Sequence, residues 1–248
     1  DEGYGRRSSA EAILESLSNE VEKNELDGIR ILVSAGPTRE PIDPVRFISN
    51  YSSGKMGYAL AESARNLGAD VELISGPVSI KMPENIKITS VETSAEMLDA
   101  VLGKIPYCDV FISAAAISDY RPSHKLTEKH KSSDGELVIR LERGEDILKL
   151  AKETKAGLYA VGFSAETNNI SDNAKIKLEK KNIDMIISNE ANHQKGLGFE
   201  SDMNEVCIIE KDSMLKIPKN TKKIIADIIL SRIAKNIKGN LIKIKNAR

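Results

Sequence analysis

The chain has 248 residues, of which 40% are hydrophobic and 29% charged, and its formal net charge is −1. This length suits one α/β domain with a large core, and the balanced charge argues against bulk binding of nucleic acid. No apolar stretch is long enough to cross a membrane, no secretory signal is evident, and the two cysteines lie in apolar segments, so we expect a reduced, cytoplasmic protein.

Short apolar runs alternate with amphipathic runs along most of the chain. The spacing predicts strands at residues 29–33, 71–74, 86–91, 109–114, 136–141, 158–163 and 183–188, and a late hairpin formed by 206–209 and 214–217. It predicts helices at 8–22, 56–67, 146–153, 171–181 and 221–235, and another that the capping-box pair Thr93 and Glu96 opens. The alternation predicts an α/β fold: a Rossmann-like, doubly wound, mainly parallel sheet with a mobile basic loop and late β-hairpin additions.

The domain organisation follows from the same pattern. We expect one domain at residues 26–236, with a linker or the tail of a preceding domain at 1–25. Residues 237–248 are rich in lysine and predict a basic, solvated tail.

A long polar loop, residues 36–53, follows the first predicted strand. Three prolines stiffen it, and loops of this length are usually functional. The loop enters a helix through Ser52, Ser53 and Gly54, where free backbone N–H groups would favour a phosphate. The alternative is that the serines only cap the helix and Gly54 only packs closely. The spacing does not match a P-loop, because Met56 follows Lys55.

Polar loops follow three predicted strands, at residues 36–53, 115–131 and 164–169. In a doubly wound sheet these loops would meet at one edge and form one cleft. The lysines at 125–131 either are a solvated charge run or close over a polyphosphate. The alanines at 114–116 either serve close packing or leave room for a nucleobase or ribose on the backbone.

Metal and covalent chemistry have little support in the sequence. His124, His130 and His193 lack the spacing of zinc ligands. Asp119 and Glu166 either hold Mg²⁺ through phosphates and water or cap turns. The nucleophile-elbow pattern G-x-S-x-G and the dinucleotide fingerprint G-x-G-x-x-G are both absent from the sequence.

Four motifs together resemble the phosphopantothenoylcysteine synthetase family. They are S-A-G-P-T-R-E-P-I-D-P-V-R-F-I-S-N-Y-S-S-G-K-M-G at 34–57, A-A-A-I-S-D-Y at 114–120, E-K-H-K at 128–131 and V-G-F-S-A-E-T-N at 161–168. The resemblance extends over residues 29–233. The opening residues 3–6 resemble the end of the family's flavin-dependent decarboxylase domain, so the resemblance implies that such a domain is fused to this one and that residues 1–25 are its tail.

The resemblance implies an activity. Members of the family join 4'-phosphopantothenate to L-cysteine with CTP and Mg²⁺, through an acyl-cytidylate intermediate, and release CMP and pyrophosphate. It also implies a homodimer, with the late hairpin as a candidate interface.

The resemblance further assigns roles to residues. It implies that Lys129 assists formation of the acyl-cytidylate, that Asn50 handles this intermediate and that Arg46 acts nearby. The residues implied to bind the nucleotide are Ala114, Ala115, Ala116, Asp119, Phe163, Lys177 and Lys181. One departure concerns the mobile loop, where Ser132 replaces the last lysine of the family's K-x-K-K pattern.

Two other functions are compatible with the predicted fold. An NAD(P)-type oxidoreductase would use the same sheet, but the missing glycine fingerprint disfavours it. A nucleotide-binding module without catalysis would keep residues 114–119 but would not need Arg46, Asn50 and Lys129 together.

Overall fold

The computed structural model describes residues 24–131, 133, 135–166, 170–190 and 201–246. Its strands are β1 (Arg30–Ala35), β2 (Arg39–Pro41), β3 (Phe47–Ser49), β4 (Asp70–Ser75), β5 (Lys87–Ser90), β6 (Val110–Ser113), β7 (Tyr120–Pro122), β8 (Leu141–Arg143), β9 (Tyr159–Glu166), β10 (Met185–Glu190), β11 (Met203–Ile209) and β12 (Met214–Thr221). Its helices are α2 (Lys55–Asn66), α3 (Ser94–Lys104), the short 3₁₀ turn η1 (Ile105–Tyr107), α4 (Ile147–Thr154), α5 (Ile170–Lys181) and α6 (Lys222–Asn246). The helix expected at 8–22 lies outside the described residues.

The main sheet confirms the predicted doubly wound fold. Within the described residues its eight strands follow the order β12-β11-β10-β9-β6-β1-β4-β5. The chain runs outward from β1 through β4 to β5, and then returns past β1 to β6, β9 and β10, all in parallel. The late hairpin is also confirmed, because β11 and β12 add antiparallel strands to the far edge. The order reverses between β1 and β6, and ligands bind at such a point in open α/β sheets.

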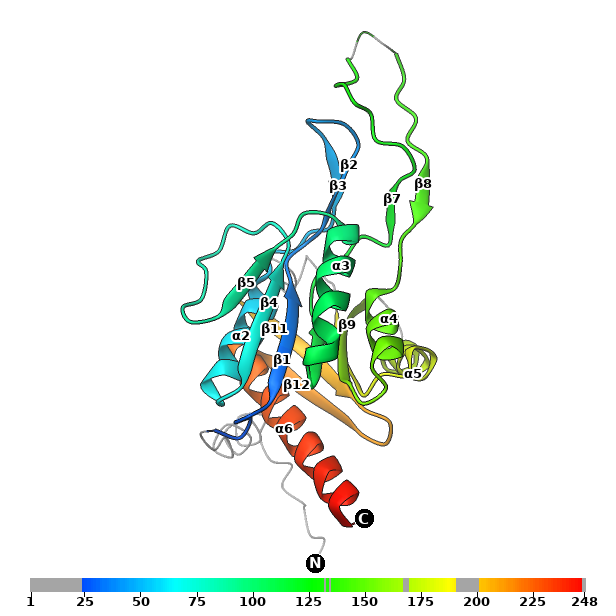
Figure 1. Cartoon of the computed structure of the whole chain (residues 1–248). Coiled ribbons are helices and arrows are strands. Elements are labelled where there is room, and N and C mark those ends of the chain that lie inside the picture. The colour runs from blue at the N-terminus through cyan, green and yellow to red at the C-terminus, as the bar shows by residue number, and fades with distance from the viewer. Residues whose placement is uncertain (1–23, 132, 134, 167–169, 191–200, 247–248) are drawn as a thin grey trace, which may run out of the picture.

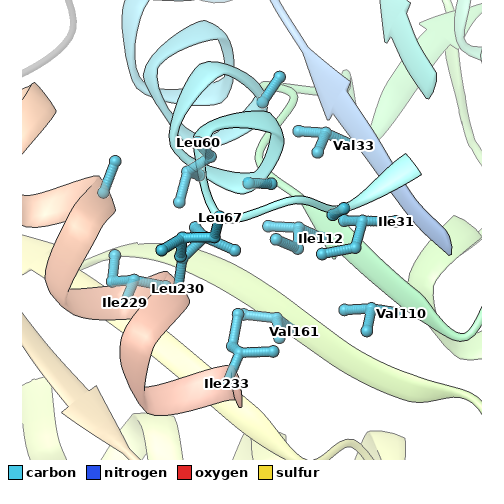
Figure 2. Packing of buried hydrophobic residues seen from close by; sticks show 14 of the residues in the cluster. Ile31, Val33, Leu60, Leu67, Val110, Ile112, Val161, Ile229, Leu230 and Ile233 are labelled. Atoms are coloured by element: carbon cyan, nitrogen blue, oxygen red, sulfur yellow. The ribbon is translucent and has the colours of Figure 1, made fainter. Parts of the chain in front are cut away.

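Helices cover both faces of this sheet because the central strands are apolar on both sides. Successive residues of β1 point to opposite faces, so Ile31 and Val33 join one buried cluster and Leu32 the other. Figure 2 shows the first cluster, in which Leu60 of α2 and Leu67 at its C-cap approach Ile229 and Leu230 of α6. Helices α3, α4 and α5 cover the opposite face.

Local signals explain several element boundaries. Thr93 accepts a hydrogen bond from the Glu96 backbone N, and the Glu96 side chain accepts one from the Thr93 backbone N, so the predicted capping box is present at α3. Helix α2 ends at Asn66 with Leu67 as its C-cap, and Gly68 follows with φ of 90°, as expected for a glycine stop. At the other end of the chain, α6 continues to Asn246, so most of the expected basic tail prolongs this helix. Basic residues are compatible with a helix carboxyl end.

Two short antiparallel hairpins project from the carboxyl-end edge of the sheet (Figure 1). Strands β2 and β3 form the first hairpin inside the segment predicted to be a loop, with Arg39 opposite Ser49. Strands β7 and β8 form the second, and residues 123–140 between them make a long arm. The strand predicted at 136–141 is therefore wrong, because only Leu141–Arg143 pairs. The apolar residues there have no sheet to cover, and Val138 is 79% exposed.

Candidate functional site

A cleft of about 720 Å³ lies at the carboxyl ends of β1 and β6, where the strand order reverses. Its lining comes from segments 49–57, 113–117 and 143–148 and from Asp119, Phe163, Lys177, Lys181, Asn189, Asn204 and Lys222. The structure thus brings together the polar loops that follow the first and fourth predicted strands. Residues 167–169 of the third expected loop lie outside the described residues.

Three glycines allow the loops beneath the cleft to meet. A Cβ added at Gly76 would lie 1.9 Å from the carbonyl oxygen of Pro37. Gly36 and Gly54 both have positive φ, and a Cβ on Gly54 would lie 2.7 Å from Val78. This close packing of main chain holds the start of α2 against the end of β1, and only glycine fits there without displacement.

The predicted anion site is at the start of α2. Gly54 is the N-cap residue, with φ of 77°, and no side chain caps it. Ser53 and Gly54 both line the cleft. The N–H groups of a first helical turn and the helix dipole favour an anion at such a helix start.

Main-chain hydrogen bonds fix the alanine segment and Asn50 relative to each other. Ala114 N donates to Ser34 O at 3.1 Å, and Ala116 N donates to Gly36 O at 2.8 Å. The Nδ2 group of Asn50 donates to Ala116 O at 3.1 Å and to Ile117 O at 3.2 Å. Asn50 and the alanines therefore form one wall of the cleft, and the donor end of the Asn50 amide is already engaged by the protein.

The opposite wall contains the predicted nucleotide-binding residues on β9 and α5. Phe163, Lys177 and Lys181 line the cleft, and the two lysines are one helical turn apart. Lys177 Nζ donates to Ser164 Oγ at 3.0 Å, and Lys181 Nζ lies 2.9 Å from Asp146 Oδ2. Both ammonium groups are thus held at the cleft by fixed partners. Asp119, from the loop after β6, also lines it.

Arg46, expected near the reaction, lies outside the residues that line the cleft. Its Nε donates to the buried Asp43 carboxylate at 2.9 Å, and its Nη2 donates to His130 O at 3.0 Å. Asp43 also accepts from Val45 N and Arg46 N, both at 2.8 Å. The hydrogen bonds from Arg46, followed by those from the backbone, hold the pKa of Asp43 well below its ordinary value. Arg46 therefore links the turn between β2 and β3 to the arm.

Lys129 shares this location with Arg46. It lies on the exposed arm, outside the cleft lining of its own chain. The arm is tied down on both sides of Lys129, because Leu126 N donates to Ile42 O at 2.9 Å and His130 O accepts from Arg46. The structure thus places Arg46 and Lys129 together, and apart from Asn50 and the alanines.

Two parts of the lining were not predicted. Residues 143–148 include Asp146, which caps α4 by accepting from Lys149 N at 3.2 Å. Its position before an apolar run indicated a helix start, but nothing in the sequence marked it as part of a site. At the other end of the cleft lie Lys55, Asn189, Asn204 and Lys222.

Lys222 is the most unusual of these residues. It is only 6% exposed. Burial, and then the nearby Lys55 ammonium, lower the pKa of Lys222 from 10.5 to about 8, although Asp202 acts in the opposite direction. The sequence signal was weak, because Lys222 and Lys223 read as an ordinary basic helix start.

Two features are absent from the part of the chain that the structure describes. No group of three or more His, Cys, Asp or Glu side chains is placed to hold a metal ion. Within the same residues, no helix combines the length and apolar character required to cross a membrane. His193 and the side chain of Glu166, named as candidates from the sequence, lie outside what is described.

Comparisons with known proteins agree with one another. The model of a family described as DNA/pantothenate metabolism flavoprotein C-terminal domain matches residues 26–237. The Coenzyme A biosynthesis bifunctional protein CoaBC of Vibrio vulnificus (strain CMCP6) is 43% identical over 206 residues, which are 82% of this chain and 51% of the relative. The CoaBC protein of Bacillus subtilis (strain 168) is 44% identical over 211 residues, which are 84% of this chain and 52% of the relative.

A solved structure gives the same result. The crystal structure of the C-terminal domain of a CoaBC bifunctional protein is 42% identical and has a TM-score of 0.75. The match covers 88% of this chain and 100% of that one. The present chain spans about half the length of the curated relatives it matches.

Proposed function

This chain belongs to the DNA/pantothenate metabolism flavoprotein C-terminal domain family, and from that premise we propose that it is a phosphopantothenate–cysteine ligase. It would join 4'-phosphopantothenate to L-cysteine with CTP in the biosynthesis of coenzyme A, in the cytoplasm. The observation that carries the proposal is the cleft at the switch point, where the alanine segment, Asn50 and the two lysines of α5 line one cavity. The bifunctional relatives fit a decarboxylase fused to the native protein.

In the first step the pantothenate carboxylate attacks the α-phosphorus of CTP. A C–O–P linkage forms as the bond to pyrophosphate breaks, which gives the acyl-cytidylate. The approach of a carboxylate to a triphosphate gathers negative charge, so fixed cations and N–H groups should lower the barrier. Lys177 and Lys181 line the cleft on one wall, and the start of α2 supplies N–H groups on its floor.

In the second step the amine of cysteine attacks the acyl carbon. The new amide bond forms as CMP leaves, and the amine gives up a proton. We assign Asn50 to orienting the acyl-cytidylate, because its amide adds no charge that would compete with the phosphate. Its Nδ2 is anchored on Ala116 O and Ile117 O, which fixes the orientation of the whole group.

The nucleotide would bind along the alanine wall. The small side chains of residues 114–116 leave the backbone accessible to base or ribose, and Phe163 faces the same cavity. A magnesium ion held through substrate phosphates needs one or two protein carboxylates. Asp119 and Glu145 line the cleft and fit this requirement, and such an ion would neutralise charge on the triphosphate.

We assign the remaining pair, Arg46 and Lys129, to the cleft of a second copy in a homodimer. Both lie outside the cleft lining of their own chain, on the first hairpin and the arm. Most large apolar side chains exposed in the described residues lie on the same two projections or next to them: Val45, Phe47, Tyr51, Tyr120, Leu126, Val138, Ile139 and Leu141. Such clustering is typical of an interaction surface. These projections replace the late hairpin as the proposed interface.

The activity is tested by measuring release of CMP and pyrophosphate with and without each substrate. We expect release of pyrophosphate to require phosphopantothenate, and release of CMP to require both phosphopantothenate and cysteine. Asn50→Ala should allow pyrophosphate release but accumulate acyl-cytidylate, visible by mass spectrometry. Binding of CTP without turnover would indicate a non-catalytic module instead, and selective binding of NAD or NADP would indicate an oxidoreductase.

The homodimer is tested by complementation. Asn50→Ala removes a side chain that acts in the cleft of its own chain, and Lys129→Ala removes one proposed to act in the cleft of the partner. If Lys129 acts in the cleft of the partner, a mixture of the two variants forms one intact site per mixed dimer and recovers part of the parental rate. A mixture no faster than the separate variants, or a monomer in sedimentation, would contradict this arrangement.

A further inference from the structure

The end of the cleft formed by α2 and α6 brings two lysines to one place. Lys222 is the first residue of α6, and its backbone N donates to Asp202 O at 2.9 Å. Its side chain lines the cleft although the residue is 6% exposed. Lys55 is the first residue of α2 and lines the same end. Lysines are rarely buried to this degree in proteins.

The electrostatics of this end favour an anion. Lys55 occupies a helix start, where the dipole disfavours a cation, and the first turn of α2 contains no acidic residue. Asp202 raises the pKa of Lys222; its side chain is 82% exposed and lies 2.6 Å from Lys55 Nζ. Burial and Lys55 both lower the pKa of Lys222. A cation at a helix start and a buried lysine beside it are both locally unfavourable, and such features are expected at functional sites.

We propose that Lys222 and Lys55 bind a phosphate group at this end of the cleft, opposite Lys177 and Lys181. A phosphate offers several acceptor oxygens and a compact negative charge, which suit two ammonium groups. Asn204 belongs to the same end and is 5% exposed; its Oδ1 accepts from Glu205 N at 3.0 Å, so the other end of this amide is a donor. The ammonium groups of Lys222 and Lys55 and the amide nitrogen of Asn204 can each donate to an anion.

The phosphate has two possible sources under the proposed function. It is either the terminal part of the nucleoside triphosphate or the phosphomonoester of phosphopantothenate. The existence of the subsite does not depend on the proposed function, but the choice between these sources does. The experiment therefore first tests whether Lys222 binds a phosphate probe at all, and then assigns the source with the substrates themselves.

The first arm measures binding of inorganic pyrophosphate by isothermal titration calorimetry. The variants are Lys222→Met, which keeps most of the length of the side chain and removes its charge, and Lys223→Met as the matched control. Lys223 is the next residue of α6, but it pairs with Asp227 at 3.1 Å and does not line the cleft. We expect Lys222→Met to weaken pyrophosphate binding about 10- to 100-fold, as for one lost charge-assisted hydrogen bond, and the control to match the parent.

The second arm assigns the source. A loss confined to CTP, with CMP and phosphopantothenate unaffected, places the terminal phosphates of the nucleotide at Lys222. A loss confined to phosphopantothenate, with unphosphorylated pantothenate as the reference, places the phosphomonoester there. Lys55→Met should weaken the same ligand as Lys222→Met.

The subsite is overturned if pyrophosphate binds the parent and Lys222→Met within threefold, or binds neither. It is also overturned if Lys223→Met weakens binding as much as Lys222→Met. Thermal unfolding of each variant verifies that the fold is retained. A parent protein that binds pyrophosphate through Lys222 but shows no turnover would refute the proposed function and leave the subsite standing.

Discussion

Lys222→Met is expected to raise the free energy of unfolding at pH 7, even though it damages the proposed subsite. Burial and the Lys55 ammonium lower the pKa of Lys222 from 10.5 to about 8. At about 1.4 kcal/mol per pKa unit, this difference means that the folded chain carries a cost of about 3 kcal/mol to keep the ammonium charged. Methionine has a similar length, has no charge and adapts to irregular spaces. The variant should recover most of that cost.

The gain has a defined pH window. Below about pH 8 Lys222 is protonated in both the folded and the unfolded chain, so the full cost is present. Between about 8 and 10.5 the folded chain loses this proton first, the unfolded chain binds more protons, and the stability of the parent rises with pH. The advantage of Lys222→Met should therefore shrink across this interval and vanish above it.

Urea unfolding at pH 7 and pH 9.5 measures this effect, with Lys223→Met as the control. The control should differ little from the parent at either pH, because Lys223 is largely exposed and its pair with Asp227 is weak. A Lys222→Met variant less stable than the parent at pH 7, or an advantage that does not decline at pH 9.5, would refute the electrostatic reasoning about this end of the cleft.

Three further substitutions probe other features. Asp43→Asn removes the charge that holds Arg46, so residues 126–131 should exchange amide hydrogens faster; unchanged exchange would contradict the role of this contact. Gly76→Ala would place a Cβ 1.9 Å from Pro37 O and should lower the unfolding free energy by at least about 2 kcal/mol, whereas a neutral result in chemical denaturation would show that the loops can separate. Thr93→Ala removes a capping box and should cost about 1 kcal/mol in the same assay, with Thr93→Ser as the variant that retains stability.

The sheet was predictable because its strands are apolar and its helices are amphipathic. The buried positions on β1, β6 and β9 restrict the pairing register of these strands, and the Thr93 capping box predicted the start of α3. The antiparallel strands β11 and β12 were also legible from two short apolar runs. For these elements, local pattern and tertiary packing favour the same structure.

The projections were not predictable from pattern alone. The segment that contains β2 and β3 reads as a proline-stiffened loop, and its turn depends on Asp43 accepting main-chain hydrogen bonds. The arm contains apolar residues with strand-like alternation, such as Val138, but no layer of its own chain covers them. Alternating apolar residues indicate that one side of a segment is apolar, but they do not tell which other part of the protein, or which partner, covers that side.

The sequence predicted the lining residues that lie in loops after strands of the sheet. It did not predict the lining residues that belong to elements distant in the sequence. The alanine segment follows the central strand β6, and Asn50 belongs to the long segment between β1 and α2, so the topology brings them to one edge. Lys222 lies at the start of the last helix, and only the addition of β11 and β12 to the sheet carries it there. The order of the motifs along the chain also could not predict that Arg46 and Lys129 lie outside the cleft lining.

The meeting point of Gly36, Gly54 and Gly76 has a consequence for small molecules that occupy the cleft. Of the three, Gly54 lines the cleft, and none of them has space for a Cβ. A compound resting against Gly54 would contact main chain that point mutations leave in place, because a side chain added there would first disturb the junction of α2 with β1. Resistance to such a compound would have to come from the surrounding walls, where Phe163 and Lys177 can be exchanged without breaking that junction.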